Sequence, residues 1–274
     1  MAQVRGKSRL VACKNIQPLK LLQPASPGPA CHVVLSSYGG GLVAGDVIRL
    51  RVAVRAGARL VLTTQASTRV FRSIDGAVAG QHTVGELAES ALAVGFPDPV
   101  VPQAESRYRQ TQEWHLHPTA LLLLVDWFHS GRMDQGERFA FTSLHSELRV
   151  QVAGRLVVLD RFGFQPEKNI ANAPANFAGY QSFFSAFLVG SPTDARFELL
   201  REMLARQQMP GSTAPHFNLD SQECVVSVAQ ARENVWVLRA AAHSRMALQP
   251  LCEAILAALA HEKLLGYNPL ARKY

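Results

Sequence analysis

The sequence predicts a mainly β protein, a solenoid-like scaffold of two sheets that coil together like a β-helix, with a small α-helical C-terminal portion. The first observation is the alternating segment Val47–Arg55, whose apolar and basic residues take opposite faces. A period of two is that of a half-buried strand. The second is a recurring pattern in which small or turn-forming residues precede an alanine and then an apolar strand. The alanines are Ala58, Ala91 and Ala120.

The spacing of these alanines favours stacked repeats. They are 33 and 29 residues apart, which is typical of supersecondary units that stack and share one core. The alternative is an ordinary β-sandwich whose turns fall at similar intervals. The sequence leaves both arrangements open.

Further strands are predicted on both sides of the repeats. One is Cys31–Ser36, ahead of the alternating segment. Two more, Phe139–Val152 and Leu156–Phe162, flank the turn residues Gly154 and Arg155. A short turn between two strands predicts that they pair as a hairpin.

Helices are expected only near the C-terminus. Ser191 is predicted to cap the first, with a proline in the first turn and an apolar stripe formed by Phe197, Leu200, Met203 and Leu204. A second helix is predicted over Pro250–Leu265, and Gly266 ends it. Flexible connections are expected at Asn172–Asn176 and Gln207–Pro215.

The chain of 274 residues with 48% hydrophobic residues has ample material for a substantial core. We expect one domain over residues 1–274, with a β scaffold over about 6–165 and the two helices within about 190–266. The longest apolar run, residues 119–128, is far shorter than the ~20 residues needed to cross a bilayer. The first residues lack a hydrophobic signal region, so we expect a cytoplasmic protein without membrane contact.

Charge and cysteine content exclude other classes. The net charge is +7, but no run of five basic residues occurs, so nucleic acid is not the expected partner. A solvated surface, or a surface matched to acidic partner proteins, fits the charge better. The four cysteines form no CxxC pair, which indicates buried or idle thiols rather than a zinc site or disulfide framework.

A glycine cluster lies in Tyr38–Asp46 and leads into the alternating strand. Because it does not open a helix, it cannot present a helix N-terminus to a phosphate, so a dinucleotide or P-loop function is not indicated. The glycines are expected to allow positive φ or a close approach to another strand.

Oxygen-bearing side chains gather in the same region and in the segment that follows. They are Asp46, Thr63, Thr64, Gln65 and Ser67. Such ligands hold divalent ions loosely, which suits passage more than storage. Asp126 lies inside an apolar strand and needs a donor or a wet cavity. Arg132 and Arg138 are the donors expected from proximity in sequence.

His115 and His117 are the one histidine pair with the spacing of a strand-borne metal site. A jelly-roll site of the cupin type also needs a nearby carboxylate, and Pro118 to Leu122 supply none. HExxH and GxSxG motifs are absent from the sequence, so hydrolase chemistry has little support.

Several blocks of distinctive residues follow one another in a fixed order along the chain. They are the glycine cluster followed by Asp46, then Thr63–Phe71, Phe96–Pro102, Tyr108 with Gln110, Leu123–Trp127, Gly131-Arg132 and Gly136–Phe139. In this order and spacing the blocks resemble the urease accessory protein UreD family, also called UreH. The resemblance spans about residues 6–165. The chain departs from the family pattern at Arg69, where lysine is commoner, at Phe71, where tyrosine is, and at Gln103, where an aromatic residue often stands.

The resemblance implies a non-catalytic urease maturation factor that acts as a scaffold or chaperone. Proteins similar to it bind apo-urease, the helical accessory protein UreF and, through UreF, the GTPase UreG. They form hetero-oligomers, dimeric through UreF, and help to deliver nickel, which would be cargo in transit and not a stable cofactor. The apolar faces of the late helices would then be docking surface for UreF.

Within that function, we expect a transient nickel path lined by Asp46, Thr63, Thr64, Ser67, Asp126 and Glu137. Two alternatives remain open. One is a cupin-like or jelly-roll metalloenzyme that uses His115 and His117. The other is a β-solenoid that binds acidic polymers, which accounts for the charge but not for the glycine and Thr63–Phe71 blocks.

Overall fold

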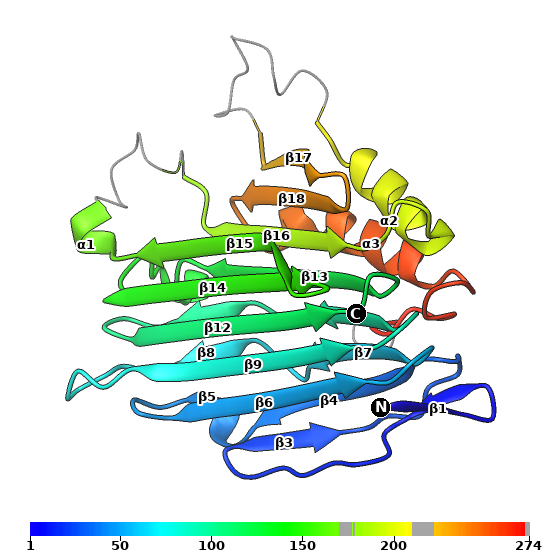
Figure 1. Cartoon of the computed structure of the whole chain (residues 1–274). Coiled ribbons are helices and arrows are strands. Elements are labelled where there is room, and N and C mark those ends of the chain that lie inside the picture. The colour runs from blue at the N-terminus through cyan, green and yellow to red at the C-terminus, as the bar shows by residue number, and fades with distance from the viewer. Residues whose placement is uncertain (170–176, 178, 210–221, 272–274) are drawn as a thin grey trace.

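Four coils of chain stack on one another in the computed structural model, which describes residues 1–169, 177, 179–209 and 222–271. Each coil gives one strand to a large sheet and one to a small sheet (Figure 1). The large-sheet strands of the coils are β4 (Cys31–Ser37), β7 (Arg59–Thr64), β10 (Leu92–Phe96) and β13 (Leu121–His129). The small-sheet strands are β6 (Val47–Val54), β9 (Ala79–Leu87), β12 (Arg107–Leu116) and β14 (Ser143–Val152). Corner strands join them: β5 (Gly41–Leu42), β8 (Thr68–Val70) and β11 (Val100–Pro102).

Other elements extend both sheets and cover one of them. At the edges of the large sheet lie β3 (Leu19–Leu22) on one side and β16 (Ser182–Val189), β18 (Val235–Ala242) and β17 (Cys224–Arg232) on the other. The small sheet ends with β15 (Arg155–Phe164), and β1 (Ala2–Val4) pairs with β2 (Lys7–Arg9). The helices are α1 (Pro166–Asn169), α2 (Ala195–Ala205) and α3 (Gln249–Leu259), with 3-10 turns η1 (Tyr38–Gly40), η2 (Met133–Gln135) and η3 (Met246–Leu248).

The repeated alanines stack as the spacing predicted. The backbone N–H of Leu92 donates to the Ala58 carbonyl at 2.9 Å, and that of Leu121 donates to the Ala91 carbonyl at 2.9 Å. Strands β7, β10 and β13 pair in parallel, so equivalent residues of successive coils lie side by side. Parallel pairing through whole coils confirms the solenoid, and the antiparallel sandwich alternative is wrong.

The strand predicted over Phe139–Val152 begins later, at Ser143. Phe139 has φ of 51°, which a strand residue does not adopt, and its ring packs at 5.3 Å from that of Phe164. The hairpin prediction is confirmed, because β14 and β15 pair antiparallel through a turn at Gly154, whose φ is 77°.

Both predicted helices exist with different bounds. Asp194, and not Ser191, caps α2, since its Oδ1 accepts from the Arg196 backbone N–H at 2.8 Å. The α3 helix ends at Leu259, because the residues after it form turns that close at Gly266, with φ of 75°. The predicted connection 172–176 lies outside the described residues, as does the part of the second connection from 210 onward.

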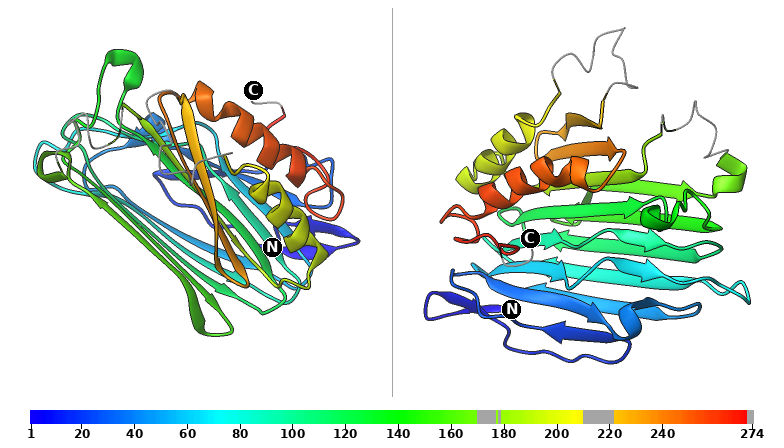
Figure 2. Two further views of the ribbon diagram at one scale, coloured as in Figure 1. Left: turned by 90° about the horizontal axis from the view of Figure 1, so that it is seen from above. Right: turned by 180° about the vertical axis from the view of Figure 1, so that it is seen from behind.

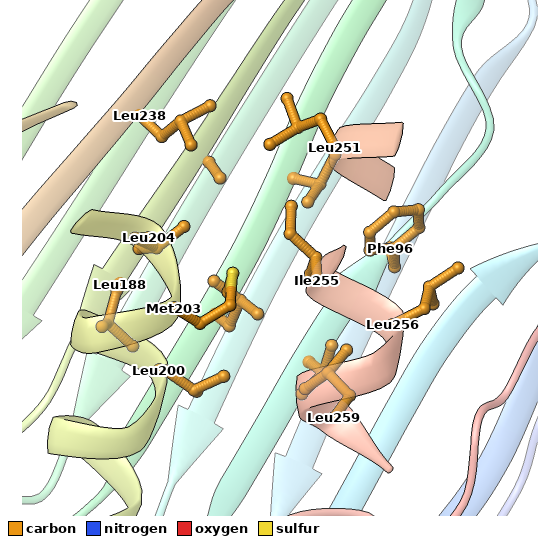
Figure 3. Close-up of a cluster of buried hydrophobic side chains, with 14 of the residues drawn as sticks. Phe96, Leu188, Leu200, Met203, Leu204, Leu238, Leu251, Ile255, Leu256 and Leu259 are labelled. Atoms are coloured by element: carbon orange, nitrogen blue, oxygen red, sulfur yellow. The ribbon is translucent and has the colours of Figure 1, made fainter. Parts of the chain in front are cut away.

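The core has two main layers. One lies between the sheets, and the other lies between the large sheet and helices α2 and α3, which cross its outer face (Figure 2). In this second layer Leu200, Met203 and Leu204 of α2 and Ile255 and Leu259 of α3 meet Leu188 and Leu238 of the sheet (Figure 3). The expectation that these apolar faces dock UreF is therefore wrong, because the chain itself covers them. In the described ranges, no helix has the length and apolar character to cross a bilayer.

Candidate functional site

Polar residues interrupt the apolar layer between the two sheets and line three neighbouring cavities. The lower cavity, beside β3 and β4, has a volume of 340 Å³. The middle one has a volume of 60 Å³, and the upper one, which reaches β16, β17 and β18, has a volume of 420 Å³. Thr64 and Thr68 line both the lower and the middle cavity. Gln110 and Asp126 line both the middle and the upper cavity. The three cavities are therefore neighbours in a row that crosses the stacked coils.

The threonine pair at the end of β7 lines the middle cavity, but neighbouring side chains of a strand alternate in direction, so Thr63 and Thr64 make their contacts on opposite faces of the sheet. Thr63 is almost fully buried, and its Oγ1 lies 2.8 Å from His32 Nε2 in a hydrogen bond. Thr64 Oγ1 donates to Asp98 Oδ2 at 2.8 Å and accepts from the Asp98 backbone N–H at 2.7 Å. Ser67, four residues after Thr63, lines the lower cavity.

Asp126 lies at the junction of the middle and upper cavities. Its Oδ1 accepts from Gln110 Nε2 at 3.1 Å and its Oδ2 accepts from Ser146 Oγ at 2.8 Å. Burial raises the pKa of this carboxyl, and the two hydrogen bonds oppose that shift. The expectation that Arg132 and Arg138 donate to Asp126 is wrong. Arg132 pairs with Glu137 instead, and the Asp126 side chain points from β13 towards β12 and β14.

An ion pair joins the two sheets at the upper cavity. Arg239 of β18 binds Asp160 of β15, and its Nη1 donates to Ser185 Oγ at 3.1 Å. All three residues line the upper cavity. Among the ion pairs of the described residues, this one alone links a strand of the large sheet to a strand of the small sheet.

Two predicted path residues lie away from this row. Asp46 Oδ2 accepts from the Val43 backbone N–H at 3.0 Å, so its carboxylate caps the turn before β6. Glu137 accepts from the Arg132 backbone N–H at 3.1 Å and forms an ion pair with the Arg132 side chain. Neither residue lines any of the three cavities.

His115 and His117 do not converge. His115 Nε2 lies 3.3 Å from Glu113 Oε1 on β12, whereas His117 lies past the strand end with Nδ1 2.9 Å from Thr119 Oγ1. Within the described ranges, His, Cys, Asp and Glu form no group of three that could hold a metal ion. The jelly-roll fold that the metalloenzyme alternative needs is not the fold of this chain.

The most important polar residues that the sequence reasoning missed are Asp98, Gln110 and Arg239. From sequence Asp98, between two prolines, suggests no more than a rigid turn, yet it is buried and accepts from Thr64. The sequence signal that could have identified Asp98 is its position as a charged residue between two prolines in an apolar block. Gln110 lies two residues after Tyr108 on β12, so the period of two places both side chains on the inner face of the sheet.

The glycine cluster serves close strand approach, as expected. A Cβ on Gly41 would lie 2.6 Å from the Arg69 carbonyl oxygen and 2.7 Å from Phe71 Cε2. Strand β5 therefore reaches its parallel partner β8 only because residue 41 has no side chain.

Comparison with known proteins finds similarity along nearly the whole chain. The model of the UreD urease accessory protein family matches residues 1–273. "Urease accessory protein UreD" of Cytophaga hutchinsonii is 34% identical over 273 residues, covering 98% of this chain and 94% of that protein. The protein of the same name from Sorangium cellulosum is 36% identical over 272 residues, covering 99% of this chain and 82% of that protein.

A plant protein is similar over a shorter stretch. "Urease accessory protein D" of Oryza sativa subsp. indica is 35% identical over 175 residues, covering 62% of this chain and 57% of that protein. The bacterial matches extend well beyond residue 165, so the similarity is not confined to the β scaffold. This chain belongs to the UreD urease accessory protein family.

Proposed function

We propose that, during urease maturation, this chain carries nickel along the row of cavities between its sheets, within a complex that contains apo-urease, UreF and, through UreF, UreG. Because this chain belongs to the UreD family, it is a urease accessory protein with a scaffold role and not an enzyme. Association with urease and other accessory proteins is likewise a property of the family. Nickel is the cargo in this proposal.

The row of oxygen donors across an otherwise apolar interior is the observation that carries this proposal. Cavity-lining hydroxyl, amide and carboxylate oxygens come from Thr64, Thr68, Gln110, Ser146 and Asp126. Isolated oxygen ligands bind nickel more weakly than grouped imidazole or thiolate ligands do. In the described part of the chain no such group lies along the row, so an ion would meet weak sites in succession.

The proposed path includes four of the six residues expected from sequence: Ser67, Thr64, Thr63 and Asp126. Asp46 and Glu137 hold turns outside the cavities, so the path proposed here does not include them. UreF would dock on a surface other than the apolar faces of α2 and α3, because those faces are buried in the core.

The substitution Asp126→Asn tests the path. It keeps the size of the side chain and removes the carboxylate that lines both the middle and the upper cavity. We expect about tenfold slower nickel loading of urease, which corresponds to about 1.4 kcal/mol, while the complex with UreF and urease still forms. Asp46→Asn is the matched control, since the amide oxygen can still cap the turn.

Nickel bound per urease is measured by elemental analysis over time, beside the yield of the purified complex. Normal loading with Asp126→Asn contradicts the path. Equal slowing by Asp46→Asn contradicts it as well, because that residue lies outside the cavities.

A further inference from the structure

Strand β6 leaves one side open at the end of the small sheet (Figure 1). The strand order is β15-β14-β12-β9-β6, so in the described part of the chain β6 pairs with β9 and with no other strand. We name the side that faces away from β9 the β6 edge. The eight residues of β6 contain no proline and keep one register with β9, from Val47 opposite Gly80 to Val54 opposite Leu87. A strand edge of this kind is a template for a further strand.

The other strands that end the two sheets offer shorter or interrupted edges. Strand β3 has only four residues. On β17 the pairing with β18 contains a register shift, and the Val228 backbone N–H already donates to Gln208 Oε1 at 2.6 Å. The pairing of β15 with β14 is also shifted in register, and Asp160 of β15 is bound to Arg239. Of these four described edges, the β6 edge is therefore the long and regular one.

The backbone groups that point to the β6 edge belong to the odd-numbered residues of the strand. The Gly80 backbone N–H of β9 donates to the Asp46 carbonyl at 2.7 Å, so the even-numbered residues turn their polar groups to β9. Successive residues of a strand turn them to opposite sides. The groups at the β6 edge are thus those of Val47, Arg49 and Arg51. With the other described residues they form no backbone hydrogen bond on that side.

The N-terminal residue already uses the far end of the same edge. The Met1 amino group donates to the Ala53 carbonyl at 2.7 Å, and the Arg55 backbone N–H donates to the Met1 carbonyl at 3.0 Å. This is the hydrogen-bond pattern of a chain segment that lies beside β6 as a strand. The segment then turns away to pair with β2. The β6 edge therefore accepts a neighbouring backbone, and its stretch from Val47 to Arg51 stays open.

The side chains along the β6 edge carry unbalanced positive charge. Arg49, Arg51 and Arg55 are exposed, and none of them forms an ion pair within the described ranges. The Asp46 carboxylate, ahead of the strand, caps a turn. The outward side of β9 carries one carboxylate, that of Glu86, which likewise forms no ion pair with a described arginine. Three guanidinium groups against one carboxylate favour an acidic occupant.

The same charges disfavour a second copy of this chain as the occupant. In an antiparallel pair of β6 strands related by a twofold axis, Arg49 and Arg51 of both copies would share one face of the joined sheet. Like charges opposite each other on a sheet destabilise the pair, and charged side chains on edge strands commonly prevent such self-association. A strand with acidic residues at alternate positions has no such repulsion.

We propose that an extended segment of a partner protein in the maturation complex adds to the small sheet at the β6 edge, with acidic side chains at alternate positions. Its backbone bonds the open N–H and C=O groups of Val47, Arg49 and Arg51, and its acidic side chains lie on the outer face beside the two guanidinium groups. The partner's place in the maturation complex rests on the proposed function, whereas the open edge and its charge do not.

Binding by full-length chains at two salt concentrations tests the role of charge. Purified cognate UreF, UreG and apo-urease are titrated separately, and then as preformed pairs. We expect Arg49→Gln with Arg51→Gln to weaken one of these probes about tenfold and to reduce the salt dependence of its binding. Arg109→Gln is the matched control, because Arg109 is exposed on the same outer face but lies on β12, beyond β9. Equal weakening by Arg109→Gln overturns strand addition in favour of docking on the broad face.

A second double variant tests the backbone at constant charge. Arg49→Gln with Arg51→Pro differs from the first variant only in a ring at residue 51, which removes an N–H that points to the β6 edge and none that bonds β9. Proline is tolerated at such positions of edge strands. We expect about a further tenfold weakening of the same probe. An unchanged melting temperature shows that the variant is folded, and wild-type affinity of both double variants for all probes overturns the proposal.

Amide hydrogen exchange in the wild-type complex gives a readout that needs no variant. The N–H groups of Arg49 and Arg51 should exchange rapidly in the free chain and slowly in the complex. Those of Ile48 and Leu50 face β9 and should be protected in both. Rapid exchange at Arg49 and Arg51 in the complex overturns the proposal.

Two further measurements decide the class of occupant. A dimer of the chain alone that the proline variant dissociates overturns the proposal in favour of self-association. Duplex DNA that binds in a manner dependent on Arg49 and Arg51 overturns it as well. Failed edge tests with slow nickel loading by Asp126→Asn leave the path intact, and the reverse result leaves the β6 edge intact, so the two proposals fail separately.

Discussion

Gly85 of β9 and Trp114 of β12 lie directly opposite each other, and the indole ring fills the space that a side chain at residue 85 would need. A Cβ on Gly85 would lie 2.1 Å from Trp114 Cε3 and 2.3 Å from Cζ3. Trp114 is among the largest fully buried side chains between the two sheets. The packing of two adjacent coils therefore depends on one missing methyl group.

Gly85→Ala should lower the free energy of unfolding by about 3 kcal/mol, because the indole ring must leave its position to relieve the overlap. Gly80→Ala is the control on the same strand, since its Cβ would have nearest neighbours at 3.5 Å, an ordinary contact distance. Chemical denaturation measures both. Equal stability of the two variants would show that the Trp114 ring moves at little cost.

His129 should make stability depend on pH. Burial, reinforced by Arg245, lowers its pKa from 6.5 to about 4. Between these values the unfolded chain binds a proton that the folded chain does not, so the free energy of unfolding rises with pH from 4 to 6.5 and gains nothing further above. The contribution is about 3 kcal/mol over that window.

The variant His129→Gln isolates this effect. Its amide can still bond Ser182 Oγ, which lies 2.9 Å from His129 Nδ1, but it does not titrate. The difference in stability between wild type and variant should change by up to 1.4 kcal/mol per pH unit below pH 6.5 and stay constant above it. A difference that is flat from pH 4 to 8 contradicts a neutral buried histidine.

The thiols should differ sharply in reactivity. Cys13 is exposed, whereas burial raises the pKa of Cys224 to about 11 and that of Cys252 to about 12. Burial also raises the pKa of Cys31. Because the thiolate is the reactive form, a thiol reagent at pH 7.5 should label one cysteine rapidly and the other three only after unfolding. Cys13→Ser should abolish the rapid phase, and a rapid phase that survives contradicts this assignment.

Helix α3 should contribute to folding and not to docking through its apolar face. Ile255 is fully buried against the large sheet, so Ile255→Ala should cost about 2–5 kcal/mol. Glu253→Ala, on the exposed side of the same helix, should change stability by less than about 0.5 kcal/mol. Under the proposed function, in which the chain binds UreF, the folded fraction of Ile255→Ala should bind UreF as wild type does. A loss of UreF binding without a loss of stability would restore the face as a docking surface.

Local patterns in the sequence favoured the coil architecture, and the parallel pairing of β7, β10 and β13 decided it against the sandwich. Ala58, Ala91 and Ala120 precede equivalent strands, and the period of two in Val47–Arg55 gave the inner and outer faces correctly. These features are local, because alternation and turn chemistry depend on neighbours in the chain. Bounds were less well predicted: the capping residue of α2 and the end of α3 depend on contacts that the helix signals alone do not specify.

The sequence by itself determined the alternating faces of the strands, the family resemblance and the wealth of oxygen donors, and it favoured the solenoid, but the tertiary structure alone decided which donors meet. Arg132 and Arg138 were the donors expected for Asp126 from proximity in sequence, but Asp126 instead bonds Gln110 and Ser146, which are 16 and 20 residues away. Likewise Arg69, Gln103 and Arg132 share a cavity although they come from three different coils. The physical reason is that coil stacking sets the register between strands, and register fixes which side chains from distant segments face each other.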